Sequence, residues 1–251
     1  MLYSIQVHSE KYTVDSSTKI PCFFSLVNGS NNPRCFYLPY PNYEPFQYGD
    51  FIGSVGKGGS ANCMVLTVAP HGCGTHTECV GHITEEEYSV SDILQESFFL
   101  CYYSTIGTDK NGKDSVVSTE KLKSLLSKMP KNVKALALNI NGDFSGDSSG
   151  GNPPYFFGET MELLVNFGIE HLVVNTPSVD KEEDEGVLES HHIFWNYKRN
   201  GDIRVNATIT EYANFPEVLN PGLHLLEIQI APFTTDASPS RIFLYPITDS
   251  R

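Results

Sequence analysis

The chain of 251 residues is poor in positive charge, with 17 lysines and arginines against 30 aspartates and glutamates and a formal net charge of −13. So acidic a chain repels a phosphate backbone, and it has no basic stripe with interleaved aromatic residues, so we expect no nucleic acid among its partners. Long apolar runs are missing too. The longest, Phe98–Tyr103, is far shorter than the roughly 20 residues a helix needs to cross a bilayer. We therefore expect no membrane partner either.

Paired cysteine motifs are also absent. The six cysteines all lie between Cys22 and Cys101, and no two of them form a CxxC pair. The N-terminal sequence MLYSIQVHSEKY has no basic region followed by a long apolar stretch, which a signal peptide requires. Free thiols in a reducing cytoplasm are the default for such a chain, so we predict a cytoplasmic protein.

No internal repeat or low-complexity tract divides the chain, and strand and helix patterns alternate through its middle. Asn28–Gly49 is rich in Asn, Pro, Tyr and Gly, which predicts a long irregular loop of the kind that is more often functional than idle. Many strands with few helices favour a mixed α/β domain, and strand–helix–strand spacing predicts a parallel crossover unit. The expected helices are Thr119–Met129 with a Thr cap, Glu159–Phe167 and Val187–Trp195, and the expected strands are Cys63–Val68, Phe98–Ser104, Ala135–Ile140, His171–Asn175, Ile209–Glu211, Leu225–Ala231 and Ile242–Ile247.

The segment Pro70–Ile83, PHGCGTHTECVGHI, concentrates side chains that bind metals. It holds His71, His76 and His82, three of only eight histidines, together with Glu78. Imidazole and carboxylate groups are the usual ligands of a divalent ion such as zinc or manganese. Because His76 and Glu78 are two positions apart, both point to the same face of an extended strand and could hold one ion together. His82 would then lie near enough to act on whatever the ion binds.

The stretch GTHTECVGH, from Gly74 to His82, resembles the HxGTHxDxPxH signature of the cyclase-like hydrolases, the family of bacterial kynurenine formamidases. The resemblance covers roughly Lys19 to Arg251. The segments GDFIGSV and GGSAN before this stretch, and NTPSVD after it, lie in the expected order along the chain. It implies a single cyclase-like hydrolase domain over residues 1–251. The fold implied is a compact α/β domain with a mixed β-barrel-like core flanked by helices, the swivelling β/β/α fold, in a homodimer or homotetramer.

The resemblance also implies a metal site with one or two ions, zinc or manganese. His76 is then a ligand, and Glu78 takes the position of a bridging Asp. His191 and Glu211 complete the second metal, and His82 is the catalytic acid/base.

Three positions depart from the family signature. The family's first histidine falls at Gly72, so His71, one place earlier, is the candidate substitute ligand if the backbone bulges. Glu78 replaces Asp and lengthens the side chain by one methylene, and Val80 replaces Pro. The first two departures touch the metal directly. They leave open the number and identity of the ions and the activity on the family's best-known substrate.

Several assignments have structural alternatives. His191 and His192 are adjacent and point different ways, so at most one is a ligand, and the family spacing favours His191. Glu211 could be an ordinary charge on an edge strand, and the histidines could be structural hydrogen-bonding groups. Cys73 and Cys79 could be thiolate ligands or a nucleophile, but their spacing fits no zinc motif, which favours small buried residues.

The predicted reaction opens a C–N bond in a small-molecule substrate: an amide, a formamide or a cyclic amide, with N-formylkynurenine as the best single candidate. Hydroxide on the metal attacks the carbonyl carbon, and His82 returns a proton to the leaving nitrogen. Loop aromatics could wall an apolar substrate, namely Phe36, Tyr37, Tyr40 and Tyr43. Two other classes remain open. One is a binding protein that keeps the fold but has weakened or lost its metal, and the other is a thiol-dependent enzyme that uses Cys79.

Overall fold

The computed structural model describes residues 2–7 and 10–248. Within these residues, seven strands of mixed direction close into a barrel, and the pairing of β16 with β8 completes the ring. This architecture confirms the predicted α/β class with a mixed barrel core. In order around the barrel the strands are β16 (Ala237–Thr248), β15 (Gly222–Ile230), β9 (Phe98–Ile106), β12 (Ala135–Ile140), β13 (His171–Val174), β14 (Thr208–Glu211) and β8 (His76–Glu78).

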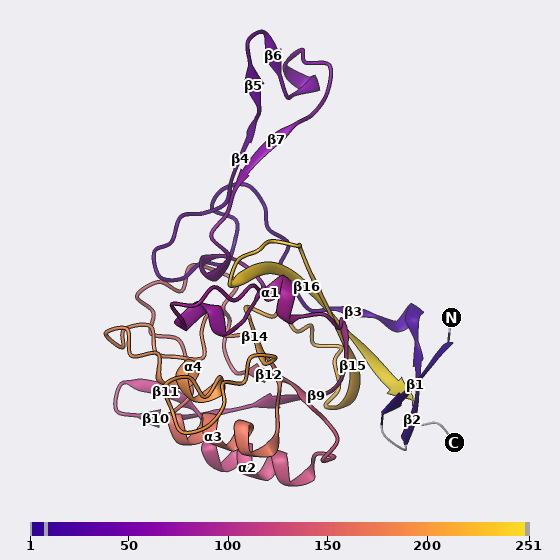
Figure 1. Ribbon diagram of the computed structural model, residues 1–251, viewed down its shortest axis with the longest axis vertical. Coiled ribbons are helices and arrows are strands. Elements are labelled where there is room, and N and C mark those ends of the chain that lie inside the picture. The colour runs from indigo at the N-terminus through magenta and orange to yellow at the C-terminus, as the bar shows by residue number, and fades with distance from the viewer. Residues whose placement is uncertain (1, 8–9, 249–251) are drawn as a thin grey trace.

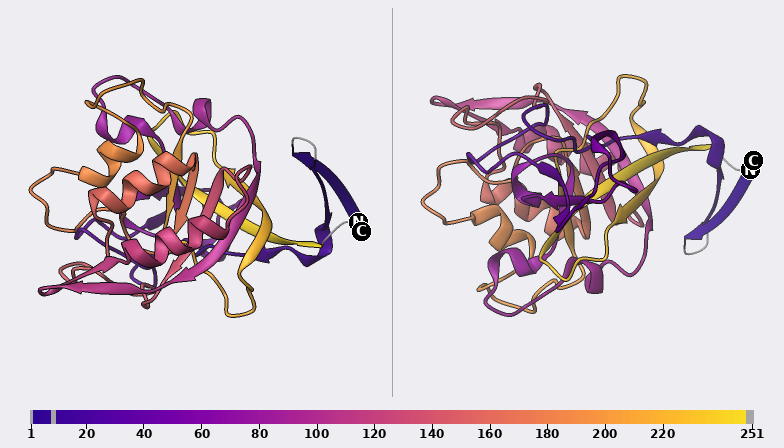
Figure 2. Two further views of the ribbon diagram at one scale, coloured as in Figure 1. Left: turned by 90° about the horizontal axis from the view of Figure 1, so that it is seen from below. Right: turned by 90° about the horizontal axis from the view of Figure 1, so that it is seen from above.

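Strands β9, β12, β13 and β14 run parallel, and helices lie in the connections between them. These are α2 (Thr119–Lys128), α3 (Gly158–Phe167) and α4 (Glu189–Phe194). The three helices line one side of the barrel, with α3 between its neighbours (Figure 2). Because helices cover one face of β12 and the barrel interior covers the other, its sequence ALALNI is almost entirely buried. The predicted crossover unit is therefore present.

Helix α2 begins one residue earlier than its predicted cap, Thr119, implies. The N-cap is Ser118, whose hydroxyl accepts a hydrogen bond from the Lys121 N–H at 3.4 Å. Thr119 lies inside the first turn instead, and its hydroxyl bonds that of Thr160 on α3 at 2.6 Å. Serine and threonine both cap helices well, so local sequence could not choose between them. The contact with α3 decides the position.

The last third of the predicted 28–49 loop is not irregular. Strand β4 (Asn42–Pro45) pairs with β7 (Met64–Thr67), and β5 (Gln47–Tyr48) pairs with β6 (Phe51–Ile52). Together residues 42–67 form an arm that projects from the barrel at the top of Figure 1. The loop prediction failed here because the strand partner of β4 lies some twenty positions further along the chain. The strand predicted over residues 63–68 exists as β7, but it belongs to the arm.

Strands β1 (Leu2–Val7) and β2 (Glu10–Asp15) form an antiparallel pair at the N-terminus. This pair extends from the end of β16 that lies well away from the helices (Figure 2). All six cysteines are free thiols. No helix in the described part of the chain is long and apolar enough to span a membrane. The remaining elements are β3 (Ile20–Pro21), β10 (Thr108–Asn111), β11 (Asp114–Val117), α1 (Val90–Ile93) and the 3-10 turns η1 (Ser16–Thr18), η2 (Val55–Lys57), η3 (Pro70–Gly72) and η4 (Val80–Ile83).

Candidate metal centre

Strand β8 holds His76 and Glu78 on the same face, because residues two apart on a strand point the same way. It lies between β14 and β16 and pairs with both. In this register Glu211 of β14 lies opposite His76, and its Oε2 is 3.4 Å from the His76 Nε2. Thr77 faces the other way, and its hydroxyl is 2.8 Å from that of Thr210. The barrel therefore brings three of the predicted ligands together, all of them buried.

His71 reaches the same cluster from the turn η3. Its Nδ1 lies 3.2 Å from the Glu78 Oε2, and its ring centre is 5.3 Å from that of His76. The family position of the first histidine, Gly72, has no room for any side chain. A Cβ there would lie 2.5 Å from the Cβ of Leu38. The structure thus places the His71 side chain beside Glu78, at a turn where Gly72 has no room for one.

Helix α4 delivers His191 from the opposite side. Its Nε2 is 3.0 Å from the Glu78 Oε1, and its Nδ1 is 2.6 Å from the Asp180 Oδ2. The Asp180 carboxylate also accepts the backbone N–H groups of Ser190 at 2.7 Å and His191 at 3.2 Å. An ionised carboxylate can only accept, so the His191 Nδ1 that faces Asp180 carries hydrogen, and Nε2, beside Glu78, is the nitrogen that could bind an ion after losing its proton.

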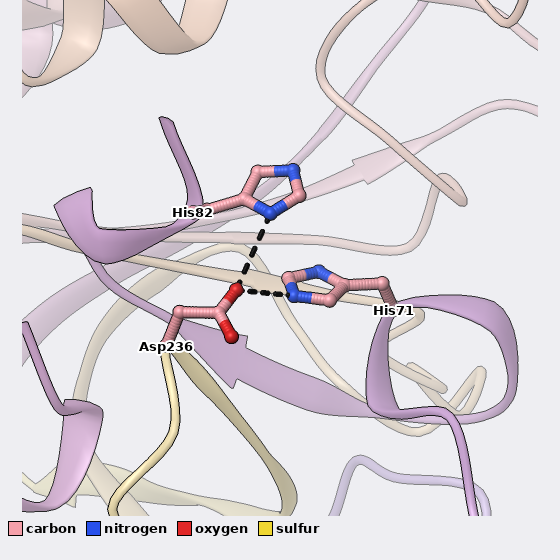
Figure 3. A group of neighbouring side chains, drawn as sticks. All are labelled: His71, His82 and Asp236. Carbon is pink, nitrogen blue, oxygen red and sulfur yellow. Dashed lines mark hydrogen bonds and ion pairs between the residues drawn. The ribbon is translucent and has the colours of Figure 1, made fainter. Parts of the chain in front are cut away.

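His82 closes the cluster on its exposed side. His82 lies in the turn η4, and its ring stacks on that of His71 with ring centres 4.1 Å apart. Its Nε2 lies 4.0 Å from the Glu78 Oε2, and its Nδ1 lies 3.4 Å from the Asp236 Oδ2. The same Asp236 oxygen is 2.7 Å from the His71 Nε2, and all three side chains converge in Figure 3.

The structure brings together all six residues that the sequence analysis singled out, and it adds two carboxylates, Asp180 and Asp236. Asp180 lies in the segment NTPSVD, which resembled the family without suggesting a role for this residue. Asp236 belonged to no recognised motif and lies 165 positions from His71. Only the pairing of β16 with β8 brings it to the histidines.

Unpaired buried acceptors show that this cluster suits a cation. The His76 Nδ1 lies 3.0 Å from the Gly74 carbonyl, so it carries the ring proton and leaves a lone pair on Nε2. That Nε2 and the Glu78 Oε2 are buried without a hydrogen-bond partner. Leaving such a group unsatisfied costs about 1–3 kcal/mol. Ligand atoms of His71, His76 and Glu78 lie within 4.8 Å of one another, so a divalent ion fits among them.

The pKa values within the cluster also indicate a site that favours a cation. Burial alone would raise the pKa of Glu78, but the charges of His82 and His191 hold that pKa well below its usual range. Burial lowers the pKa of His71, yet the neighbouring carboxylates of Asp236 and Glu78 raise it to about 10. Hydrogen bonds from His71 and His82 lower the pKa of Asp236. The site therefore keeps its carboxylates ionised and favours positive charge between them.

The alternative ligands and nucleophile lie outside this arrangement. The His192 Nδ1 is 3.1 Å from the Tyr197 carbonyl, and its ring stacks on that tyrosine. The Cys79 thiol is directed at the Tyr88 carbonyl, 3.5 Å away, and burial raises its pKa to about 11. Burial also raises the pKa of Cys73. Because the thiolate is the nucleophilic form, the structure gives no support to a thiol-dependent enzyme.

The four loop aromatics do not share one surrounding. Phe36 borders a small cavity, Tyr37 is exposed, and Tyr40 packs against a guanidinium group 4.3 Å from its ring centre. Tyr43 lies on β4, where the arm begins. A common aromatic wall for a substrate therefore does not follow from these residues.

The chain belongs to the Cyclase family, which it matches over residues 12–181. It is 23% identical over 213 residues to a kynurenine formamidase of Bacillus cereus, covering 83% of this chain and 91% of the relative. The fold is similar to that of isatin hydrolase A from Ralstonia solanacearum, with a TM-score of 0.63 at 14% identity, covering 90% of this chain and 91% of the other. It is also similar to a protein described as a predicted metal-dependent hydrolase from Bacillus stearothermophilus, with a TM-score of 0.59 at 12% identity, covering 90% and 97%.

Proposed function

We propose that this protein is a metal-dependent hydrolase that opens a C–N bond in a small amide, formamide or cyclic amide. The observation that carries the proposal is the convergence of His76, Glu78, His191 and Glu211 around buried acceptor atoms that lack donors. Relatives named kynurenine formamidase and isatin hydrolase support this reaction class. N-formylkynurenine remains the best single candidate substrate.

The ligand atoms divide into two neighbouring groups that share Glu78. One Glu78 oxygen faces His71, which groups with His76, and the other faces His191. Glu211 lies between the two groups, 3.4 Å from the His76 Nε2 and 3.9 Å from the His191 Nε2. We propose that these groups hold one or two ions, zinc or manganese. A divalent ion supplies Lewis acidity here, because it polarises a carbonyl and lowers the pKa of water.

His82 is placed to handle the proton that the reaction needs. An amine leaves readily only once it is protonated, and an imidazole with a pKa near neutrality is suited to this transfer. The His82 Nε2 faces Glu78, while about a quarter of the side chain remains exposed. We therefore assign His82 as the acid/base and expect the substrate to approach from its side.

A cavity of about 440 Å³ adjoins this exposed side. It is bordered by Gly81, Tyr88 and Asp236 and by the acidic run over residues 85–87. Its volume lies within the range typical of sites for small molecules. We propose that the substrate enters here, since His76, Glu78 and His191 are buried and are not reached directly from solvent.

Metal analysis joined to an activity panel tests the proposal. Protein purified without added chelator or metal is expected to contain stoichiometric zinc or manganese, and His76→Ala is expected to lose it. A panel of formamides, cyclic imides and lactones should reveal hydrolysis that a chelator abolishes and added metal restores. His82→Ala should keep the metal and lose about 10²–10⁴-fold in kcat.

His192→Ala is the matched control, because this neighbour of His191 faces Tyr197 and should keep both metal and rate. A folded wild-type protein that contains no metal and hydrolyses nothing in the panel, even after metal is added, would contradict the enzyme. That outcome favours the competing class, a small-molecule binding protein with the same fold.

A further inference from the structure

Two stacked imidazoles lie between two carboxylates at the exposed side of the cluster. His71 and His82 have ring centres 4.1 Å apart and planes inclined by 26°. One nitrogen of each ring faces the Asp236 Oδ2, at 2.7 Å and 3.4 Å respectively (Figure 3). The other nitrogens, the His71 Nδ1 and the His82 Nε2, face the Glu78 Oε2 at 3.2 Å and 4.0 Å.

The chemistry of Asp236 decides where the ring protons sit. An ionised carboxylate only accepts hydrogen bonds, so both nitrogens that face it carry hydrogen. A neutral imidazole then has its lone pair on the opposite nitrogen. In His71 the opposite nitrogen is Nδ1, which could hold the proposed metal once it gives up its proton, and in His82 it is Nε2, on the side where a proton must be taken up and returned. The Asp236 side chain therefore orients both rings, that of His71 for metal binding and that of His82 for proton transfer.

Asp236 is held rigidly enough for this task. Its carbonyl accepts the Cys79 N–H at 2.9 Å, and the next residue, Ala237, pairs with Glu78 in the β16–β8 ladder. Gly81 allows the turn η4 to approach closely. A Cβ there would lie 3.2 Å from the Asp236 Cβ and 2.4 Å from the Tyr88 carbonyl oxygen. The barrel thus fixes Asp236 relative to both η4 and β8.

We propose that Asp236 is a positioning residue of the candidate metal centre, fixing the orientation and tautomer of the ligand His71 and of the acid/base His82 together. This inference rests on the proposed function. It also explains how a ligand displaced by one residue is tolerated. Gly72 cannot carry the histidine, and the ring that arrives from His71 is held from behind by Asp236.

Metal affinity provides the first test. Asp236→Asn keeps the shape but replaces one acceptor oxygen by a donor. Competition with a chromophoric chelator should show zinc affinity about 10–100-fold weaker, as for other carboxylates behind a ligand histidine. Asp236→Glu should recover part of the loss. Asp92→Asn removes the same charge from the same cavity without touching either ring and should leave the affinity within about twofold.

A second readout does not need the metal. Imidazole ¹⁵N chemical shifts of the metal-free protein should show His82 protonated on Nδ1, and Asp236→Asn should mix its tautomers. In kinetics, Asp236→Asn should lower kcat in the wild-type background and have little further effect in His82→Ala.

Unchanged tautomers in Asp236→Asn overturn the positioning role, whether or not the protein binds zinc. A wild-type protein without zinc affinity contradicts the proposed function instead, and the ¹⁵N shifts then still decide the role of Asp236.

Discussion

Glu78 lies at the centre of the cluster, next to its four histidines. Its Oε1 faces His191, and its Oε2 faces His71 and His82. The side chain is fully buried, and a buried carboxylate is costly unless positive charge compensates it. Positive charge on the neighbouring imidazoles, or on an ion bound in their place, provides this compensation.

A buried histidine outside the cluster gives a prediction at the scale of a residue. His171 stacks on Phe99 with ring centres 3.8 Å apart, and its Nδ1 lies 2.9 Å from the Thr208 hydroxyl. Burial lowers its pKa to about 4, against about 6.5 for a free imidazole. Between these values the unfolded chain binds a proton that the folded protein does not. The contribution of neutral His171 to the free energy of unfolding is therefore fully present above pH 6.5. It is lost as the pH drops toward 4, by on the order of 3 kcal/mol.

Urea unfolding across this pH range checks the expectation. His171→Gln cannot titrate, so its free energy of unfolding should fall less between pH 6.5 and pH 4 than that of the wild type, with both proteins in excess chelator. Parallel pH profiles for the two proteins would show that His171 does not contribute.

At the scale of elements, the helices connect the parallel strands of the barrel. The N-cap of α2 can be tested by a single substitution. Ser118→Ala removes the acceptor for the Lys121 N–H and should lower the free energy of unfolding by about 1 kcal/mol. Ser127→Ala is the matched control, because this exposed serine bonds the Ser124 carbonyl near the other end of the helix. Chemical denaturation measures both. Equal stabilities for the two variants would contradict Ser118 as the cap.

At the scale of the whole molecule, the arm over residues 42–67 projects away from the barrel (Figure 1). It exposes several large apolar side chains, namely Phe46, Tyr48, Phe51, Val55, Met64, Val65 and Leu66. Soluble proteins rarely expose large apolar patches outside interaction sites, so this concentration of exposed apolar side chains suits a contact with another chain. The expectation of a homodimer or homotetramer remains a prediction, and we propose that the arm contacts a second copy of the chain.

Light scattering coupled to size-exclusion chromatography tests this expectation. The wild-type protein should have two or four times the chain mass of 27.9 kDa. Met64→Thr combined with Leu66→Thr should reduce the mass to that of one chain, because threonine keeps the strand while removing apolar area. Val187→Thr with Val218→Thr, which changes exposed valines elsewhere, should leave the mass unchanged. A wild-type mass of one chain would overturn the proposal.

The amino-acid pattern alone determined the local elements and the core of the site. Periodicity located α2, α3 and the buried strands β12 and β13, because each pattern is specified by neighbours within one turn or one strand. The two-residue spacing of His76 and Glu78 likewise set them on one face of β8, since side-chain alternation is a local property.

Tertiary structure alone decided what depends on distant partners. Strand β4 needed β7, the choice of Ser118 over Thr119 needed α3, and Asp236 needed the pairing of β16 with β8. The exclusion of a side chain at Gly72 likewise comes from Leu38, which lies against it only in the folded chain. Such contacts form between segments that are remote in sequence, and local propensity carries no information about which remote segment will arrive.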